Sequence, residues 1–336
     1  QLTYLLLMNE ISLSKKEIRN RLNSIRIKPK GLEKREYGVS VKYFNENDQI
    51  PYKRIDYELT LDLKIILNQG ELLIDKTSIY YNQHEPDLIN EIISNSITQS
   101  IYPLKVELNE KGQTPNKILN YDEIQNRWKN QQKIISEKYE SAALSTFFET
   151  VNHKFENKSQ LEKSLQHDWF WNLFFHPKLV NYGERRTIET DLYLAVIPYQ
   201  SPVRFKGIQK IEKIPTDYYS FIISFNSIEQ KAPKYFYPAN KPESLEIYMQ
   251  LNVEYDLDIF HHFSMHTRAR LIIYTKDVLE NKTILKRIEF TQYQQNTEIY
   301  KDQKLTADSP FITGGLVKLP PNKWGFDNFE NLENDW

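Results

Sequence analysis

The chain has 336 residues, of which 40% are hydrophobic and 26% are charged, a balance typical of a globular protein rather than a disordered one. It contains no cysteine, which excludes disulfides, thiolate metal sites and cysteine nucleophiles. The formal net charge is −1, so the whole-chain balance favours neither nucleic acid nor an anionic membrane surface as a partner.

The N-terminal stretch carries no clear targeting signal. Its apolar run, Tyr4 to Met8, is too short for the core of a signal peptide, and no basic leader precedes it. Because the chain begins with Gln1, we expect that a signal peptide, a tag or another N-terminal segment preceded it. No apolar run reaches the length of a transmembrane helix. The heavy use of Lys, Asn, Ile and Tyr is typical of an AT-rich genome, and we expect a soluble bacterial protein of the cytoplasm or the periplasm.

In chain order, residues 3–8 predict a short strand, and Ser14 with Glu17 forms a capping box that predicts a helix. The clearest pattern follows at 54–65, where every odd position is apolar and every even one is polar or charged. Period-two alternation of this length predicts a strand with one dry face and one wet face, which is typical of antiparallel sheets. Residues 37–43 alternate in the same way, and residues 70–82 are the predicted hairpin partner.

The pattern changes near 86–98, where apolar residues recur at helical spacing and Pro86 suits a first turn. Two strands are predicted around the turn residues Asn109 to Gly112. From 121 to 176 the apolar spacing predicts three helices, which end at the helix-breaking Pro177.

Strand patterns resume after the helices and continue through most of the remaining chain. We predict strands at 187–198, 203–214, 218–228, 245–259, 265–275 and 283–293. The fold class is therefore α+β, dominated by twisted antiparallel sheet. We divide the chain into a β-rich part (1–120), a helical insertion (121–176), a second β-rich part (187–319) and an acidic aromatic tail (320–336).

Three of the seven histidines, His261, His262 and His266, lie within six residues. On a helix, His262 and His266 would share a face and bind one metal ion. The flanking residues alternate with period two, however, and on a strand the two side chains would be about 13 Å apart. We therefore predict no metal site here, but a polar strand face made of His262, His266, Arg268 and Arg270.

A hairpin would place the acidic wet face of 252–258 opposite the basic wet face of 264–270. Glu254 would then lie near Arg268, and Asp256 near His266, as favourable cross-strand charge pairs. The bend between them lacks Gly, Asn and Pro, so a β-bulge is the alternative.

Motifs for catalysis and cofactor binding are missing from the sequence. It has no G-x-S-x-G elbow and no glycine-rich phosphate loop. Asp87 and the acidic residues before it loosely match a nuclease carboxylate set, but the Glu-x-Lys that should follow is absent. We predict no catalytic residue and no cofactor.

Two aromatic segments are candidate binding sites. Trp169, Phe170, Trp171 and Phe174 either dock a helix onto the sheet or line a pocket for an apolar ligand. In the tail, Pro320 and Pro321 form a stiff spacer before acidic residues interleaved with apolar anchors. The predicted partner-binding residues are Trp324, Phe326, Phe329, Leu332 and Trp336. The alternative is that the tail folds back onto the chain's own sheet.

We therefore hypothesise a non-enzymatic protein-binding protein, such as an adaptor, a chaperone-like protein, an immunity-type inhibitor or a component of a secretion or envelope assembly. The first alternative is a carrier of a lipid or another apolar ligand in a cavity between sheet and helices. The second alternative is a hydrolase or nuclease whose site residues are dispersed in the sequence.

Overall fold

A computed structural model describes the part of the chain that forms the sheet and its helices. The described residues are 34–66, 69–109, 111–114, 117–139, 142–197, 200–212, 220–237, 246–258, 262–277 and 279–295. The strand predicted at 3–8, the helix predicted after Ser14 and the aromatic tail lie outside these residues.

The described residues form one antiparallel sheet of eleven strands. The strands are β1 (Arg35–Asn45), β2 (Lys53–Ile66), β3 (Gln69–Tyr81), β4 (Leu104–Leu108), β5 (Thr187–Leu194), β6 (Val203–Ile211), β7 (Ser220–Ser227), β8 (Gln230–Lys231), β9 (Ile247–Asp258), β10 (Ser264–Lys276) and β11 (Lys282–Gln294). Their order is β4-β3-β2-β1-β11-β10-β9-β7-β6-β5, with β8 paired to β9. The first strand thus pairs with the last, which joins the two β-rich parts in a single sheet.

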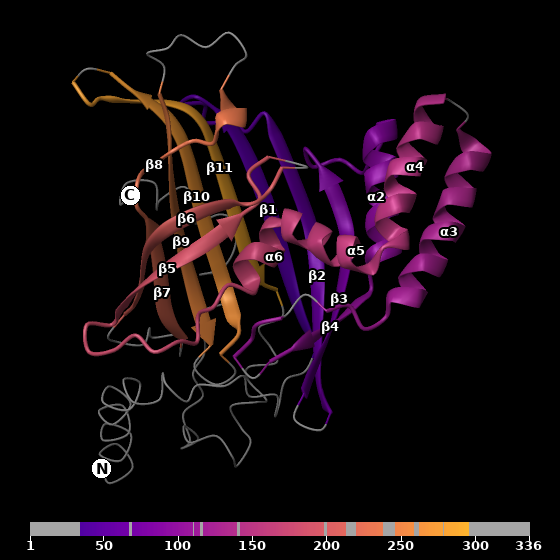
Figure 1. The fold of residues 1–336 in the computed structure, drawn as a ribbon, viewed down its shortest axis with the longest axis horizontal. Helices are drawn as coiled ribbons and strands as arrows, with labels where there is room; N and C mark the ends of the chain where they lie inside the picture. Colours follow the sequence, from indigo (N-terminus) through magenta and orange to yellow (C-terminus); the bar gives the residue numbers. More distant parts are fainter. Residues whose placement is uncertain are drawn as a thin grey trace.

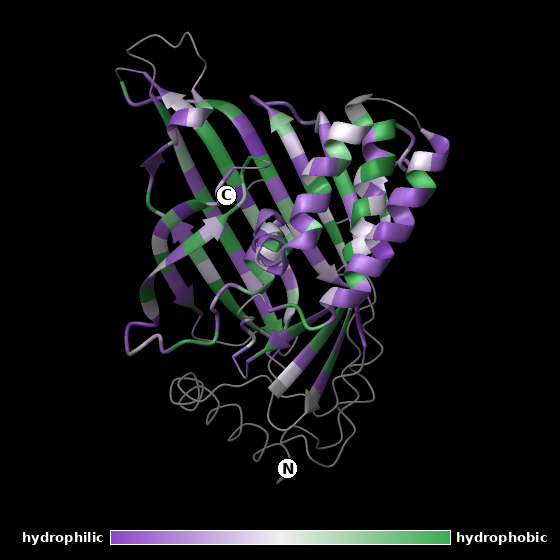
Figure 2. Ribbon diagram, turned by 45° about the vertical axis from the view of Figure 1, so that its right-hand side comes forward, coloured by the Kyte–Doolittle hydropathy of each residue, from purple (hydrophilic) through white to green (hydrophobic). Residues whose placement is uncertain are grey.

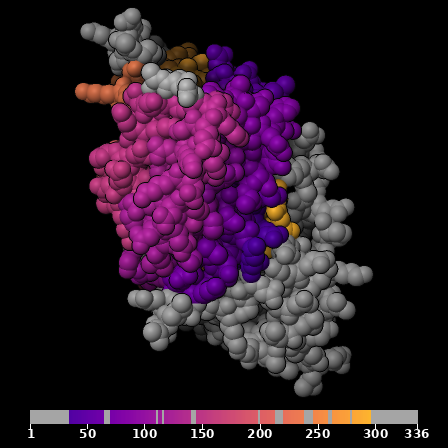
Figure 3. All heavy atoms as spheres, turned by 90° about the vertical axis from the view of Figure 1, so that its right-hand side faces the viewer, coloured from indigo at the N-terminus to yellow at the C-terminus, as the bar shows by residue number. Residues whose placement is uncertain are grey.

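The α-helices of the described residues lie between β3 and β5 in the chain. They are α2 (Ile89–Ile101), α3 (Tyr121–Lys138), α4 (Ala142–Glu156), α5 (Lys158–Ser164) and α6 (Trp169–Phe174). Arg127 of α3 donates to the carbonyl oxygens of Ser100, Ile101 and Pro103, which ties α3 to the end of α2 and the start of β4. Figure 3 shows the helices as a continuous layer beside the N-terminal strands. No helix in the described ranges combines the length and the apolar character that a membrane span requires.

The sheet curls around α6, which lies in front of the middle strands in Figure 1. Trp169 stacks on Phe290 of β11, with 6.3 Å between ring centroids. The Trp169 indole also donates to the carbonyl oxygen of Ala195, directly after β5, at 2.6 Å. Helix α6 therefore contacts both the middle of the sheet and one of its ends. We name the side that packs against α6 the concave face and the other side the outer face.

Side-chain alternation assigns residues to these two faces. Strand β6 alternates strictly between buried and exposed residues, and green and purple positions alternate along the strands in Figure 2. The buried positions of the sheet form one hydrophobic core together with the helices. The predicted antiparallel sheet is thus confirmed. The division into four parts, including a helical insertion at 121–176, stays a prediction.

The helix predicted near 86–98 is confirmed as α2, which begins at Ile89. Leu88, directly before it, and Ile89 are exposed (57% and 51%), whereas Ser96 and Ser100 are buried. One detail of the helix prediction is wrong. The third predicted helix is split into α5, a 3₁₀ turn (Leu165–His167) and α6. The split occurs because Asp168 caps a new helix through its side chain.

Phe174 offers a test of how much the packing of α6 contributes to stability. Replacing it with Ala should lower the free energy of unfolding by about 3–5 kcal/mol, because a buried ring is lost and a cavity is left. Urea unfolding followed by tryptophan fluorescence measures the change. Leu279→Ala, at a side chain that is 80% exposed, is the control and should change stability by less than about 0.5 kcal/mol. Equal effects of the two substitutions would contradict the packing described here.

Candidate functional site

The histidine segment forms a strand pair, as the sequence predicts. Strands β9 and β10 are antiparallel, with Glu254 opposite Arg268 and Asp256 opposite His266. Arg268 and Glu254 form an ion pair. The register also shifts between Ser264 and His266. The predicted strand pairing and the irregularity given as its alternative are therefore both present. His262 departs from the prediction: it lies outside both strands, with a positive φ of 62°, and so is not part of a strand face.

Burial determines the charge states of His266 and Asp256, which lie opposite each other on the outer face. Burial, and then the Arg268 charge, lowers the pKa of His266 to about 3, so its imidazole is neutral at pH 7. Burial raises the pKa of Asp256 to about 6. Within the described residues, no group of three or more His, Cys, Asp or Glu side chains is arranged to hold a metal ion.

A polar row continues from His266 across the outer face. His266 lies opposite Tyr293 of β11, Tyr293 opposite Gly38 of β1, and Gly38 opposite Glu58 of β2. A Cβ atom at Gly38 would lie 2.3 Å from Cζ of the Tyr293 ring. The ring therefore occupies space that only glycine leaves open.

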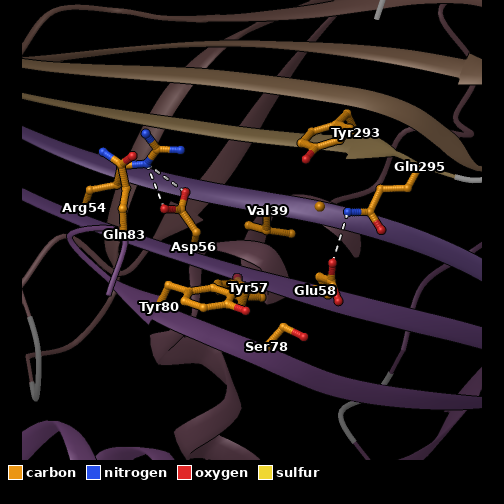
Figure 4. A pocket seen from close by; sticks show the side chains of 11 residues that line it. Val39, Arg54, Asp56, Tyr57, Glu58, Ser78, Tyr80, Gln83, Tyr293 and Gln295 are labelled. Carbon is orange, nitrogen blue, oxygen red and sulfur yellow. Dashed lines mark hydrogen bonds and ion pairs between the residues drawn. The ribbon is translucent and has the colours of Figure 1, made fainter. Parts of the chain in front are cut away.

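A pocket of about 300 Å³ opens beside Gly38 on this face. We name it the outer pocket, and Figure 4 shows its side chains. Its members used below are Gly38, Arg54, Asp56, Glu58, Tyr80 and Tyr293. The Arg54 Nε and Asp56 Oδ2 atoms form an ion pair at 2.8 Å. Glu58 accepts only a long hydrogen bond, at 3.5 Å, from the Gln295 amide.

The aromatic ligand-pocket candidates lie on the other side of the sheet. Trp169, Phe170, Trp171 and Phe174 are all buried members of α6. The Phe174 ring packs edge-on against Tyr37 at 6.3 Å between centroids and stacks on Phe263 at 5.9 Å. These side chains pack against the concave face and do not line the outer pocket.

Beneath α6, the concave face carries a set of buried polar side chains. We name it the buried polar band, and its members are Arg35, Tyr37, Tyr255, Ser264, Thr267, Gln292 and Gln294. Tyr255, Thr267 and Gln292 lie directly opposite one another on β9, β10 and β11. At one end, Arg35 Nη1 donates to Gln294 Oε1 at 2.9 Å.

Several members of the band have polar side-chain atoms without a hydrogen-bond partner among the described residues. They include the Tyr255, Thr267 and Ser264 hydroxyls and both polar atoms of the Gln292 amide. A buried polar group left without a partner costs about 1–3 kcal/mol. Such groups are rare in native proteins, and a buried water or another polar molecule is what ordinarily supplies the missing hydrogen bonds.

Both ends of α6 are fixed by charged side chains next to this band. Asp168 caps the first turn by accepting from the Phe170 N–H at 2.8 Å, and it also pairs with Lys76 of β3 at 2.9 Å. At the other end, Lys178 Nζ donates to the carbonyl oxygens of Leu173, Phe174 and His176. The same ammonium lies 4.8 Å from the centre of the Tyr255 ring.

Lys178 and His176 are both buried beside the band. Burial lowers the pKa of Lys178 to about 7. Burial, and then the neighbouring Lys178 charge, lowers the pKa of His176 to about 3. A His176 ring nitrogen lies 2.7 Å from Gln209 Oε1, and the ring stacks on Tyr255. Neither residue was singled out from the sequence, because a single Lys or His carries no pattern.

Sequence reasoning also missed Gly38, Thr267 and Gln292. Each left a signal: Gly38 interrupts an alternating strand, which is typical of a close approach. Thr267 and Gln292 are polar residues at dry positions of their strands. The predicted partner-binding residues of the tail lie outside the described residues, so their role stays a prediction.

Comparisons with known proteins give little further information. No protein-family model and no curated protein matches the chain. A solved structure described as "Lipid-protein interactions in lipovitellin" is similar over 78% of this chain and 25% of that chain, at 7% identity and a TM-score of 0.36. This chain thus spans about a quarter of that one. The dehydratase domain from the CurJ module of curacin polyketide synthase aligns over 79% of this chain and 77% of its own, at 10% identity and a TM-score of 0.11. Both scores are too low to establish a shared fold.

Lys178 makes stability depend on pH. Its pKa is 10.5 when solvent-exposed and about 7 in the folded protein, so between these values the unfolded chain binds a proton that the native state does not. The free energy of unfolding should therefore rise from pH 7 to pH 9, by up to about 1.4 kcal/mol per pH unit. Lys178→Met should remove this rise of the free energy of unfolding with pH, whether or not it changes that free energy at pH 7. Urea unfolding at pH 7, 8 and 9 measures both slopes, and equal slopes would contradict the prediction.

Proposed function

We propose that this protein is a carrier of an amphipathic apolar ligand, which binds on the concave face with its polar head on the buried polar band. The observation that carries this proposal is the row of Tyr255, Thr267 and Gln292, whose buried polar atoms have no partner among the described residues. A bound polar head would supply those hydrogen bonds.

The chemistry of the band favours a head group that both donates and accepts hydrogen bonds. The Tyr255 and Thr267 hydroxyls each do both, and the Gln292 amide has two donors and an acceptor. The matching heads are hydroxyl, carboxyl and ester groups, as in fatty acids and acylglycerols. Arg35 and Lys178 stand at either side of the row, so a carboxylate head would also find positive charge nearby.

The apolar part of the ligand needs space on the same face, and α6 occupies that space. This helix has six residues and packs mainly through aromatic rings. An alkyl chain can replace such contacts at similar buried apolar area. We therefore propose that the apolar chain packs beside α6 and replaces part of its ring contacts with the concave face, while the helix stays in place over the ligand site.

A double variant separates ligand binding from folding. Thr267→Val with Gln292→Leu keeps the side-chain shapes and removes polar atoms that lack partners, so the free energy of unfolding should stay equal or rise. Binding should fall at least about tenfold, because the head loses its hydrogen bonds. The measurements are urea unfolding and titration with dansyl-undecanoic acid, a fluorescent fatty acid.

The matched control is Gln250→Leu, on the outer-facing side of β9. It should change the free energy of unfolding and the affinity for the fatty acid only slightly. Mass spectrometry of the wild-type protein, before and after organic extraction, tests for a co-purified apolar molecule. The carrier proposal fails if nothing apolar co-purifies and the fatty acid shows no saturable binding. It also fails if the double variant binds as well as the wild type.

Protein binding is the second candidate function. The tail supports it by its composition, since aromatic anchors in an acidic segment suit a basic, apolar groove on another protein. Strand β5 supports it too, because it is an end strand of the sheet that the described residues form and its Tyr193 side chain is exposed. Edge strands can pair with an added strand from a partner.

Deleting residues 322–336 tests the role of the tail. We expect the thermal unfolding midpoint to stay unchanged and the capture of a stoichiometric protein partner from the host to be lost. The control is the chain with Trp324, Phe326 and Phe329 all changed to Ser, which keeps the length and the charge. Aggregation of the shortened chain would show instead that the tail is part of the core.

A further inference from the structure

We infer that the outer pocket binds an organic ammonium group, such as that of a quaternary amine or of a lysine side chain. This site is independent of the carrier proposal, because the pocket and the buried polar band lie on opposite faces of the sheet.

The backbone register builds the pocket. Gly38 of β1 lies between Glu58 of β2 and Tyr293 of β11, directly opposite both. Because Gly38 has no side chain, the Tyr293 ring lies directly over it, and the pocket opens beside this ring, with the Glu58 carboxylate in its lining. Tyr80 of β3 lines the same pocket, as Figure 4 shows.

The charges that line the pocket do not cancel. Asp56 is already paired with Arg54, with 2.8 Å between Oδ2 and Nε. Glu58 has no ion pair within the described residues, and its hydrogen bond from the Gln295 amide is long, at 3.5 Å. The uncompensated charge is therefore the Glu58 carboxylate, which attracts a cation and repels an anion.

The two tyrosines favour an organic cation over a small hydrated one. The faces of aromatic rings attract ammonium groups through the ring quadrupole, and partly desolvated sites strengthen this attraction. A cation beside Glu58 would meet a carboxylate and two phenol rings in one place. The volume of about 300 Å³ lies at the lower end for small-molecule pockets, which suits a compact head group.

The test is isothermal titration of the full chain with choline, with N-acetyl-lysine amide, and with 3,3-dimethyl-1-butanol, the neutral analogue of choline. We expect at least one cation to bind and the neutral alcohol not to bind. The cation that binds more tightly identifies the source of the ammonium group. Glu58→Gln should weaken cation binding about tenfold, since the charge is lost and the shape is kept.

Two further variants complete the test. Tyr80→Leu should weaken cation binding about threefold, because one aromatic face is lost. Glu189→Gln removes an exposed carboxylate on β5 and should leave binding unchanged. Both Glu58 and Tyr80 are exposed, so circular dichroism should show that these variants fold normally. The inference is overturned if neither cation binds saturably, if the alcohol binds as well as choline, or if Glu58→Gln and Glu189→Gln have equal effects.

Discussion

The packing of α6 against the concave face is the interaction on which the rest of the structure depends. One short helix contacts Tyr37 on β1 through Phe174, and it contacts Phe290 on β11 and Ala195 after β5 through Trp169. Strand β5 is an end strand of the sheet and lies far from the neighbouring strands β1 and β11 in the sheet order, so Ala195 reaches the same helix only because the sheet curls. Charged groups at both ends of α6 hold it in place, and the buried polar band lies directly beneath it.

The two proposed sites are separated by the thickness of one sheet. Consecutive residues of a strand point to opposite faces, so Gln292 belongs to the band and its neighbour Tyr293 to the outer pocket. On β10, likewise, Thr267 belongs to the band and its neighbour His266 lies on the outer face. A change of register by one residue in β11 would exchange the residues of both sites at once. The order of polar and apolar residues along β10 and β11 is therefore constrained by both faces of the sheet.

The sequence predicts the local part of this structure well. The alternation at 54–65 and 252–270 places the strands, and the opposite charges place Glu254 against Arg268. The splitting of the third helix was not foreseen, because one side-chain cap, that of Asp168, outweighs a continuous apolar pattern. Neither candidate site follows from the sequence, since each needs residues from strands that pair only in the tertiary fold. Gly38 and Gln292 look like isolated irregularities until β1 and β11 are seen side by side.

The pairing of β1 with β11 also constrains how the chain folds. Arg35 and Gln294 meet across this pair although they are 259 residues apart in the chain. Contacts this distant slow folding, because a very long loop must close before they contribute. During synthesis β1 pairs with β2 soon after both are made, but the backbone groups on its other edge stay unpaired until β11 follows. Nascent chains with such open edges are prone to aggregate. We therefore expect this protein to need protection by chaperones until β11 has been synthesised.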